Sequence, residues 1–153
     1  MTTYISGFGL SLTVPRGWEA VIYRRVPSAD EATHPVIQAA TVPIPSQRGD
    51  YGGGIVESLG SNDVFVAFLE FGPQAAGSAL FPSVLDVPEL SPDSFRARQL
   101  QRTIPGQAGV QRFFSIAGRS FCLYSVIGAF TARFALCGQA NELIGSLRVQ
   151  EGQ

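Results

Sequence analysis

The stretch "VQRFFSIAGRSFCLYSVIG", residues 110–128, decides the fold because it contains two β-rich runs separated by a glycine. Gly118 followed by Arg119 suits a two-residue type II′ turn, so the stretch predicts a β-hairpin. That turn fixes which residues lie opposite each other and share a face. The predicted pairs are Ile116 with Phe121, Phe114 with Leu123, Arg112 with Ser125, and Val110 with Ile127. One face of the hairpin is therefore apolar except for Arg112.

An earlier stretch, "NDVFVAFLEF" at residues 62–71, is apolar on both of its alternating faces. One face carries Val64, Val66 and Phe68, and the other carries Phe65, Ala67, Leu69 and Phe71. A strand that is apolar on both faces is covered on both sides. We therefore expect a central strand, in a sheet with helices or long loops over each face.

The amino-terminal part, "FGLSLTVPRGWEAVIYRR", alternates, breaks and alternates again. Residues 8–14 predict a half-buried strand that ends at a turn made by Pro15 and Gly17. Residues 19–26 predict a second strand, and residues 36–44 a third. "PSQRGDYGGG", residues 45–54, is a predicted loop, and a short helix is expected at residues 54–59.

Two regions complete the chain. Residues 72–105 follow no period, and because so long a structureless loop is unusual in a compact domain, we expect short helices or strands within them. After the hairpin, apolar residues at helical spacing predict a helix that lies across the sheet. They are Ala132, Leu136, Ala140, Leu143, Ile144 and Leu147. Gly138 interrupts this stripe and is a candidate for the true start of the helix.

Composition limits the classes of protein. A chain of 153 residues suits one domain with one well-buried core. Its formal net charge of −1 argues against a nucleic-acid partner, which needs a broad basic surface. The basic residues are all Arg, which excludes lysine Schiff-base chemistry and the P-loop lysine.

The hydropathy pattern and the cysteines suggest a location. No apolar run approaches the roughly 20 residues that a membrane-spanning helix needs, and no signal-like segment opens the sequence, so we expect a soluble protein. Cys122 and Cys137 lie within apolar patterns, which is typical of buried free thiols in a reducing compartment. We therefore expect a cytoplasmic protein, with a disulfide as the alternative if the protein is exported.

The sequence contains no recognisable catalytic, metal or cofactor motif. The only histidine, His34, lies in a polar loop directly before Pro35, which argues against Ser-His, Cys-His and zinc chemistry. "RGDYGGG" could offer backbone amides to an anion at a helix start, but it lacks the phosphate-loop glycine and lysine patterns. A flexible loop is the favoured interpretation. We predict no enzyme, no cofactor and no metal.

Three residues are candidates for a ligand pocket. Glu70 lies on the same strand face as Phe68, and Arg112 interrupts the apolar hairpin face, so the two could form a buried bidentate pair. The alternative places Arg112 at a sheet edge with its guanidinium in water. With Tyr124, this pair would line a cleft between sheet and helix.

Five further residues are candidates for contact with a partner protein: Trp18, Arg24, Arg25, Leu80 and Phe81. The Trp either covers the edge of the core or anchors an interface. The two Arg residues either end a strand in solvent or contact an acidic partner. The Leu and Phe lie in an irregular, proline-rich loop, where apolar side chains are either held in the core or presented for docking.

Three stretches resemble the PsbP-like fold family. They are the opening "FGLSLTVPRGW", the hairpin "GVQRFFSIAGRSFCLYSVIG" and the closing "ANELIGSLRV". The resemblance covers roughly the first twenty and last forty-five residues and implies an antiparallel sheet sandwiched by helices. The stretches "GWEAVIYRR" and "GRSFCLY" are also similar to those of small bacterial proteins of unknown function. Members of the family are mostly non-catalytic binding or assembly factors.

The sequence thus predicts an α+β fold, an antiparallel β-sheet with helices packed on its faces, over residues 1–153. The expected function is a non-enzymatic accessory or assembly factor that binds another protein, with homodimer formation left open. The alternative is a small-molecule binding module that uses the cleft between sheet and helix.

Overall fold

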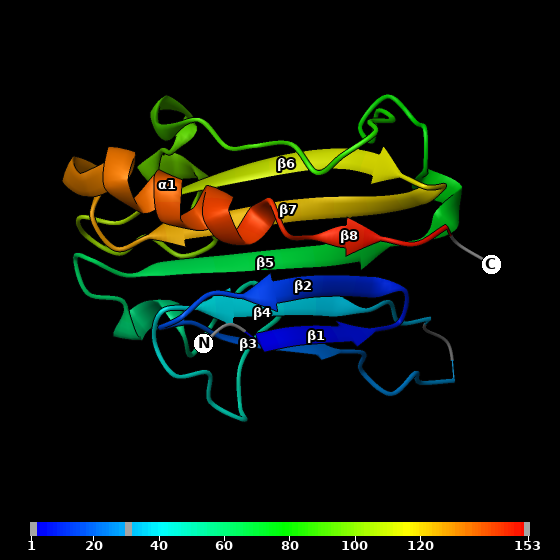
Figure 1. Ribbon diagram of the computed structural model, residues 1–153, viewed down its shortest axis with the longest axis horizontal. Coiled ribbons are helices and arrows are strands. Elements are labelled where there is room, and N and C mark those ends of the chain that lie inside the picture. Colours follow the sequence, from blue (N-terminus) through cyan, green and yellow to red (C-terminus); the bar gives the residue numbers. More distant parts are fainter. Residues whose placement is uncertain (1–2, 30–31, 152–153) are drawn as a thin grey trace.

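The structure is a computed structural model that describes residues 3–29 and 32–151. Within these residues, eight strands form two antiparallel sheets, accompanied by one α-helix and several single 3₁₀ turns. Figure 1 shows the helix and the smaller sheet in front of the larger sheet.

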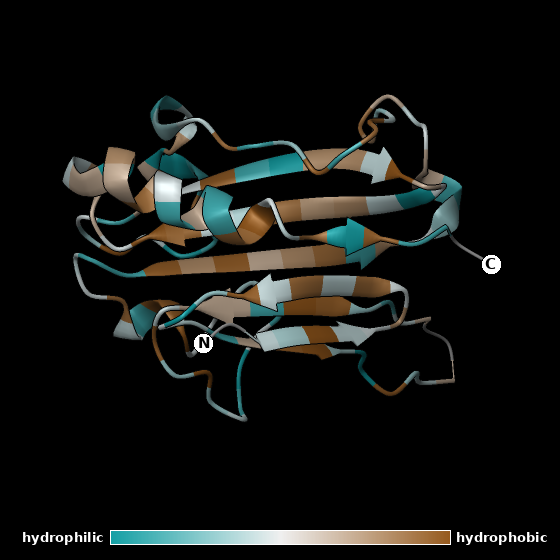
Figure 2. Cartoon of the chain, viewed as in Figure 1, coloured by the Kyte–Doolittle hydropathy of each residue, from teal (hydrophilic) through white to brown (hydrophobic). Residues whose placement is uncertain are grey.

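The large sheet has the strand order β3-β4-β5-β7-β6. Its strands are β3 (Glu19–Tyr23), β4 (Val36–Ala40), β5 (Val64–Phe71), β7 (Arg119–Ile127) and β6 (Ala108–Ile116). The prediction that the strand in residues 62–71 is central is confirmed, because β5 pairs with β4 on one side and β7 on the other. Figure 2 shows β5 and β7 hydrophobic along most of their length.

One face of the large sheet is covered by the helix and the small sheet. The helix α1 is Arg133–Ile144, and the small sheet consists of β1 (Thr3–Gly7), β2 (Leu10–Val14) and β8 (Arg148–Val149). The predicted stripe lies in the core between these layers, as its residues Leu136, Leu143 and Leu147 pack with the hairpin. The helix begins at Arg133, so Gly138 lies inside it and does not mark its start.

The opposite face of the large sheet has a second core, which irregular segments cover. Alternate residues of β7, among them Tyr124 and Val126, point to this face. They pack against Ile55 and Val56 and against partly buried Leu100. The helix expected at residues 54–59 is a single 3₁₀ turn, η1 (Val56–Ser58). Long loops therefore cover this face, as the two apolar faces of β5 required.

The predicted hairpin is present, but its turn lies one residue earlier. Ala117 and Gly118 are the two turn residues, and both have positive φ (54° and 77°), as a type I′ turn requires. Ile116 therefore lies opposite Arg119, whereas the predicted register placed it opposite Phe121. Because strand side chains alternate with a period of two, this two-residue shift leaves every predicted face unchanged. It also moves Arg119 from the turn into β7.

The amino-terminal strands differ from the prediction in three ways. Phe8 and Gly9 form the turn between β1 and β2, again with positive φ, so Phe8 does not begin a strand. The turn at residues 15–18 is present, and the Trp18 N–H donates to the Pro15 carbonyl at 3.2 Å. However, β2 and β3 on its two sides belong to different sheets. The second strand ends at Tyr23, which leaves Val26 exposed.

Residues 72–105 contain the short elements that their length predicted. Three 3₁₀ turns, η2 (Pro73–Ala75), η3 (Pro92–Ser94) and η4 (Ala97–Gln99), lie within them. Single β-bridges tie the segment to the edge strand β6, through Ser83 with Ser115 and through Arg96 with Gly109. The third predicted strand, residues 36–44, ends at Ala40.

Candidate functional site

A cavity of about 230 Å³ lies on the face of the large sheet opposite α1. The strand β7 forms one wall, and the loops at residues 49–57 and 100–107 form the others. We call it the aromatic cavity. Gln107 lines it together with residues of the second core, chiefly Tyr51, Val56, Leu100, Tyr124 and Val126. These side chains make the interior of the cavity mostly apolar.

Two tyrosines give the cavity its aromatic surface. Tyr124 lies on β7 and is 1% exposed, and the ring of Tyr51 meets its ring edge to face at 5.6 Å between centroids. The Tyr124 hydroxyl oxygen accepts a hydrogen bond from the Gln101 N–H at 2.9 Å. Burial raises the pKa of both phenols, so both are neutral at physiological pH.

Gln107 provides a buried amide in the same cavity. It is 5% exposed, and its side-chain nitrogen donates to the Val56 carbonyl at 2.9 Å. Within residues 3–29 and 32–151, its Oε1 has no hydrogen-bond partner. Buried polar atoms are nearly always paired, and an unpaired one costs about 1–3 kcal/mol. The wall of the cavity therefore contains one buried acceptor without a partner among the described residues.

An ion pair lies at the solvent side of the cavity. Arg102 donates to Glu57 at 2.8 Å, and both side chains are substantially exposed. Hydrogen bonds from the backbone N–H groups of Glu57 itself and of Gly54, together with the Arg102 charge, lower the pKa of Glu57. The two charges neutralise each other, so the entrance to the cavity favours neither an anion nor a cation.

The loop that carries Tyr51 is held to the sheet by Gln38 of β4. This fully buried side chain donates to the carbonyls of Gly49 (2.8 Å) and Asp50 (3.0 Å), and its Oε1 accepts from Arg48. The loop also approaches the sheet closely at Gly52, where a Cβ would lie 2.7 Å from the Phe65 ring. These contacts position Tyr51 over β7.

Asp50 connects this loop to the strand β3. Its Oδ1 accepts hydrogen bonds from the Tyr23 hydroxyl (2.7 Å) and from Arg25 Nε (2.9 Å). Burial acts to raise the pKa of Asp50, but the hydrogen bonds from Arg25 and Tyr23 and the charges of Arg25 and Arg48 outweigh it and lower the pKa. Arg48 also lies 4.7 Å from the centroid of the Tyr23 ring.

A second, more polar cavity of about 420 Å³ adjoins the first and shares Asp50 and Tyr51 with it. We call it the polar cavity. Arg25, His34 and Glu70 are among its lining residues. His34, which the sequence placed in a solvated loop, is partly buried there.

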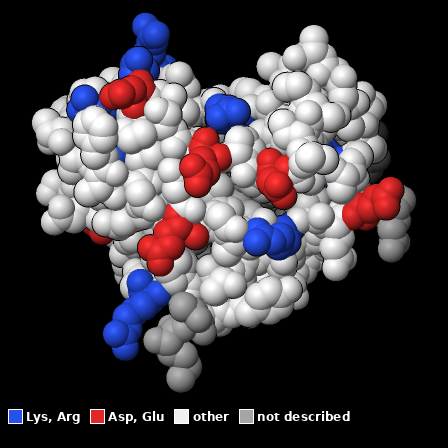
Figure 3. Space-filling model, turned by 45° about the horizontal axis from the view of Figure 1, so that its top comes forward, with Lys and Arg blue, Asp and Glu red and all other residues white. Residues whose placement is uncertain are grey.

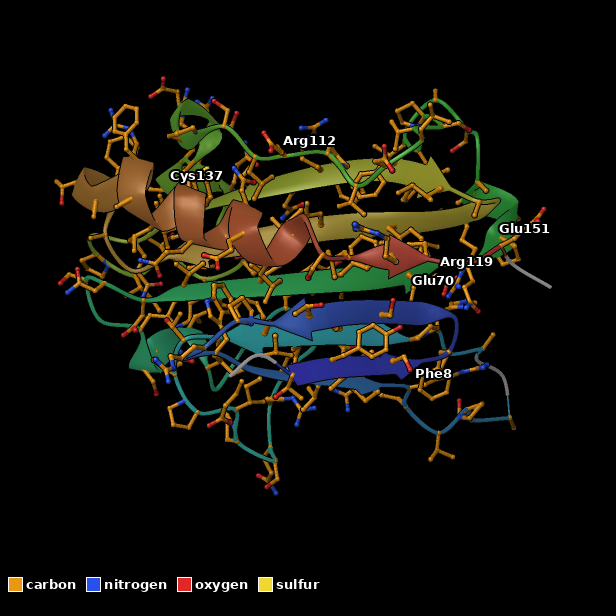
Figure 4. The ribbon with its side chains drawn as sticks, viewed as in Figure 1. Phe8, Glu70, Arg112, Arg119, Cys137 and Glu151 are labelled. Atoms are coloured by element: carbon orange, nitrogen blue, oxygen red, sulfur yellow. The ribbon has the colours of Figure 1, made fainter. Side chains whose placement is uncertain are left out.

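The three predicted pocket residues do not meet. Tyr124 lines the aromatic cavity and Glu70 the polar cavity, whereas Arg112 lines neither of them. Arg112 is exposed at the edge strand β6, away from Glu70 (Figure 4). The predicted ion pair of Glu70 with Arg112 is therefore wrong, and the alternative of an Arg at the sheet edge is correct. The aromatic cavity lies on the sheet face opposite the helix, whereas the predicted cleft lay between the sheet and the helix.

The partner of Glu70 is Arg119, which the hairpin turn had been predicted to contain. Arg119 Nε donates to Glu70 Oε2 at 2.9 Å, and Arg119 Nη2 to Glu70 Oε1 at 2.5 Å, with side-chain exposures of only 9% and 11%. The remaining guanidinium hydrogens reach the carbonyls of Phe8 (3.0 Å), Gly9 (3.3 Å) and Gln150 (3.2 Å). We call this arrangement the Arg119 clamp; it joins the two sheets.

The predicted partner-contact residues differ in exposure. Phe81 is buried and packs against Phe113 at 5.5 Å between ring centroids, whereas its neighbour Leu80 is 60% exposed. Trp18 is partly buried against the first core, which agrees with a cover on the core edge. Arg24 and Arg25 are exposed, and they bond Thr33 and Asp50 within the chain.

Sequence reasoning missed most of the cavity. Tyr51 stands within "RGDYGGG", whose pattern suggested only an anion site, and neither Gln107 nor Arg102 belongs to a periodic pattern. The tyrosine next to glycines was the one available signal, since an aromatic residue in a polar loop needs a surface to pack against.

The described part of the chain contains few other candidate features. No group of three His, Cys, Asp or Glu residues there could hold a metal ion, and no helix there has the length and apolar character to cross a membrane. Cys122 and Cys137 are buried, unpaired thiols, as predicted. On the face in Figure 3, acidic and basic residues are interspersed. Comparisons with protein-family models, with curated proteins and with solved structures find no match for this chain.

Proposed function

We propose that this protein binds a small planar molecule in the aromatic cavity. The observation that supports the proposal most is a mostly apolar cavity lined by two tyrosine rings and by the amide-bearing side chain of Gln107. Ligand sites typically combine an apolar lining with a few polar groups that fix the orientation of the ligand. The aromatic cavity has this composition.

Its volume suits the burial of one ring. A cavity of about 150 Å³ binds benzene, and drug-sized ligands occupy sites of about 300–1,000 Å³. At about 230 Å³, the aromatic cavity has room for a single aromatic ring with a short substituent. The edge-to-face arrangement of Tyr51 and Tyr124 favours a planar aromatic molecule over a saturated one.

A titration with one-ring aromatic compounds, followed by NMR of the backbone amides, tests the proposal. Toluene and anisole are suitable probes, and we expect the amides of Tyr51, Tyr124 and Val126 to shift. The amides of α1 serve as the internal reference, because the helix lies across the large sheet from the cavity. For ligands this small, the Kd should be on the order of 1 mM or below.

A pair of variants localises the binding. Leu100→Trp fills the cavity from a partly buried position, whereas Leu80→Trp adds the same side chain at an exposed position. We expect the first variant to abolish the shifts and the second to leave them unchanged. Shifts that persist in Leu100→Trp, or that extend equally over α1, would contradict the proposal.

A second candidate function, contact with another protein as an accessory or assembly factor, is supported by a different region. In the loop after η2, Leu80 and Leu85 are 60% and 95% exposed. Exposed large apolar side chains are candidate contact points when they form part of a contiguous apolar surface. A photo-crosslinking residue placed at position 85 should capture a specific protein in the native cells. The same residue at the equally exposed Val26 should not, and capture from both positions would count against docking.

Two further parts of the proposal concern kinship and location. Membership of the PsbP-like fold family is proposed on the resemblance of the three sequence stretches alone. The two unpaired thiols support a reducing, cytoplasmic location. Cell fractionation tests the location, and recovery of the protein from the extracellular medium would refute it.

A further inference from the structure

Both sheets end at the same side of the molecule. β3 is the last strand of the large sheet, β1 is the last strand of the small sheet, and the two strands lie beside each other. In Figure 1 they are the two lowest strands. Within the residues that the structure describes, no other strand pairs with the outer edge of either one. We call this side, formed by β1 and β3, the open edge.

The opposite edge of the large sheet is protected by the chain itself. Arg96 exchanges two backbone hydrogen bonds with Gly109 of β6, at 2.8 and 2.9 Å. Natural proteins also protect sheet edges with lysine, proline or a bulge. β3, with the sequence EAVIY, has none of these, and its register with β4 continues without a break over all five residues. Its outer edge is therefore suited to pair with another strand.

The direction of the backbone groups on β4 is set by its bonds to β5. The Thr41 N–H donates to the Val64 carbonyl at 3.0 Å, and the Pro35 carbonyl accepts from the Glu70 N–H at 3.1 Å. Along an antiparallel strand, successive residues direct these groups to alternate sides. Gln38 lies three residues from both Thr41 and Pro35, so its backbone N–H and carbonyl face β3.

The same alternation identifies the free groups on β3. Gln38 lies opposite Val21, so the backbone groups of Val21 face β4. Those of its neighbours Ala20 and Ile22 then face away from the sheet, and no loop or side chain among the described residues bonds them. β3 therefore presents two N–H donors and two carbonyl acceptors on its outer edge.

This pattern is complementary to itself. When two copies of β3 lie antiparallel about Val21, Ala20 of one copy is opposite Ile22 of the other, and these residues can exchange both hydrogen bonds. The two-fold axis repeats the pair, which satisfies all four groups. The charges also match, because Glu19 at the start of one strand then lies near Arg24, just beyond the end of the other. Both of these side chains are exposed.

From these features we propose that the protein forms a homodimer in which two copies of β3 pair antiparallel, with Val21 opposite Val21, so that the two large sheets become one. The matching charges favour a second copy over a strand of another protein. The proposal does not depend on ligand binding in the aromatic cavity. Interfaces at the small end of the range form weak complexes, so we expect a Kd on the order of 0.1 mM.

Sedimentation equilibrium from about 10 µM to about 1 mM protein tests the proposal. At the upper end we expect twice the mass of one chain to predominate. Val21→Lys places two like charges directly opposite each other, so it should weaken the dimer at least about tenfold. Val26→Lys is the matched control, because Val26 is 91% exposed and lies beyond the end of β3, and it should leave the Kd unchanged.

Two further variants test the pairing itself. Ala20→Pro removes an outward N–H, and because proline is tolerated where a strand N–H faces solvent, circular dichroism should find a folded protein that no longer dimerises. Val21→Cys should form a disulfide between copies on oxidation, since such opposite residues lie about 4.5 Å apart between Cα atoms. Val26→Cys should crosslink far more slowly. The native thiols do not compete, because both are buried.

A single-chain mass at about 1 mM protein would overturn the proposal. A dimer with an unchanged Kd in Val21→Lys and Ala20→Pro would also overturn it, because the copies would then meet at another surface. Crosslinking of Val21→Cys no faster than that of Val26→Cys would have the same meaning. Should Val21→Lys or Ala20→Pro not fold, the mass of the unaltered protein and the Val21→Cys crosslink decide the matter.

Discussion

The Arg119 clamp allows a quantitative prediction, because removing either partner leaves a charge buried without its counter-ion. In Arg119→Met, the Glu70 carboxylate remains about nine-tenths buried, and the carbonyls of Phe8 and Gln150 each lose a donor. Breaking a buried ion pair in this way costs about 3–5 kcal/mol. We therefore expect Arg119→Met and Glu70→Met each to lower the free energy of unfolding by that amount.

The double variant distinguishes a buried pair from two independent side chains. With both charges removed, what remains is the loss of hydrogen bonds to the turn at Phe8 and to Gln150, about 1–2 kcal/mol. The double variant should therefore be more stable than either single variant. The resulting coupling energy, several kcal/mol, is well above the error of a double-mutant cycle.

Urea denaturation with linear extrapolation measures these differences. The corresponding fall in Tm is about 2–4 °C for each kcal/mol in a protein of this size. Arg112→Met is the matched control, since Arg112 is an exposed arginine on the neighbouring strand, and we expect a change within about 0.5 kcal/mol. Equal effects of Arg112→Met and Arg119→Met would refute the reasoning, and so would a double variant whose loss equals the sum of the single losses.

Three further predictions concern other parts of the molecule. The pKa of Asp50 is lowered in the folded state, so the contribution of this carboxylate to stability is complete above about pH 4 and is lost as the pH falls. The free energies of unfolding of Asp50→Asn and of the unaltered protein, measured as a function of pH, should therefore converge in acid. Burial raises the pKa of Cys122 to about 12, so mass spectrometry should find this thiol unmodified by maleimide at pH 8 without denaturant and fully modified in urea. Gly52→Ala should lose about 1–3 kcal/mol, because its φ is 92° and the new methyl group would overlap the Phe65 ring. Gly53→Ala, where the nearest atom is 3.8 Å away, should lose less than about 0.5 kcal/mol in the same urea assay.

Periodicity predicted the parts of the fold in which burial alone decides the pattern. The two apolar faces of β5 placed that strand in the centre, and the helical spacing of Leu136, Leu143 and Leu147 placed them in the core. Both patterns are long, and both follow from which side chains are removed from water. Local sequence was sufficient for these elements.

The turn residues, in contrast, were not predictable from the same patterns. Ala117 and Phe8 adopt positive φ, a conformation that non-glycine residues rarely take and that tertiary contacts must stabilise. Misplacing the turn of the hairpin at Arg119 left Arg112 as the only basic residue on the apolar face, and this produced the wrong partner for Glu70. One error in the turn therefore accounts for the error in the ion pair.

The aromatic cavity was unpredictable for another reason. Its walls come from β7 and from two loops whose residues follow no period, and Tyr51, Gln107 and Tyr124 meet only because the loops fold back over the sheet. Such contacts depend on the path of the backbone and leave no spacing in the sequence.

The small sheet also has a consequence for the speed of folding. Leu10 pairs with Val149, and Ser11 with Arg148, so two segments from opposite parts of the sequence lie side by side. Contacts between residues so far apart require a large loop to close before they contribute any stability. Chains dominated by such pairings acquire their native structure in milliseconds to seconds, many times more slowly than helical bundles. We therefore expect slow refolding, with the pairing of β2 and β8 among the last steps.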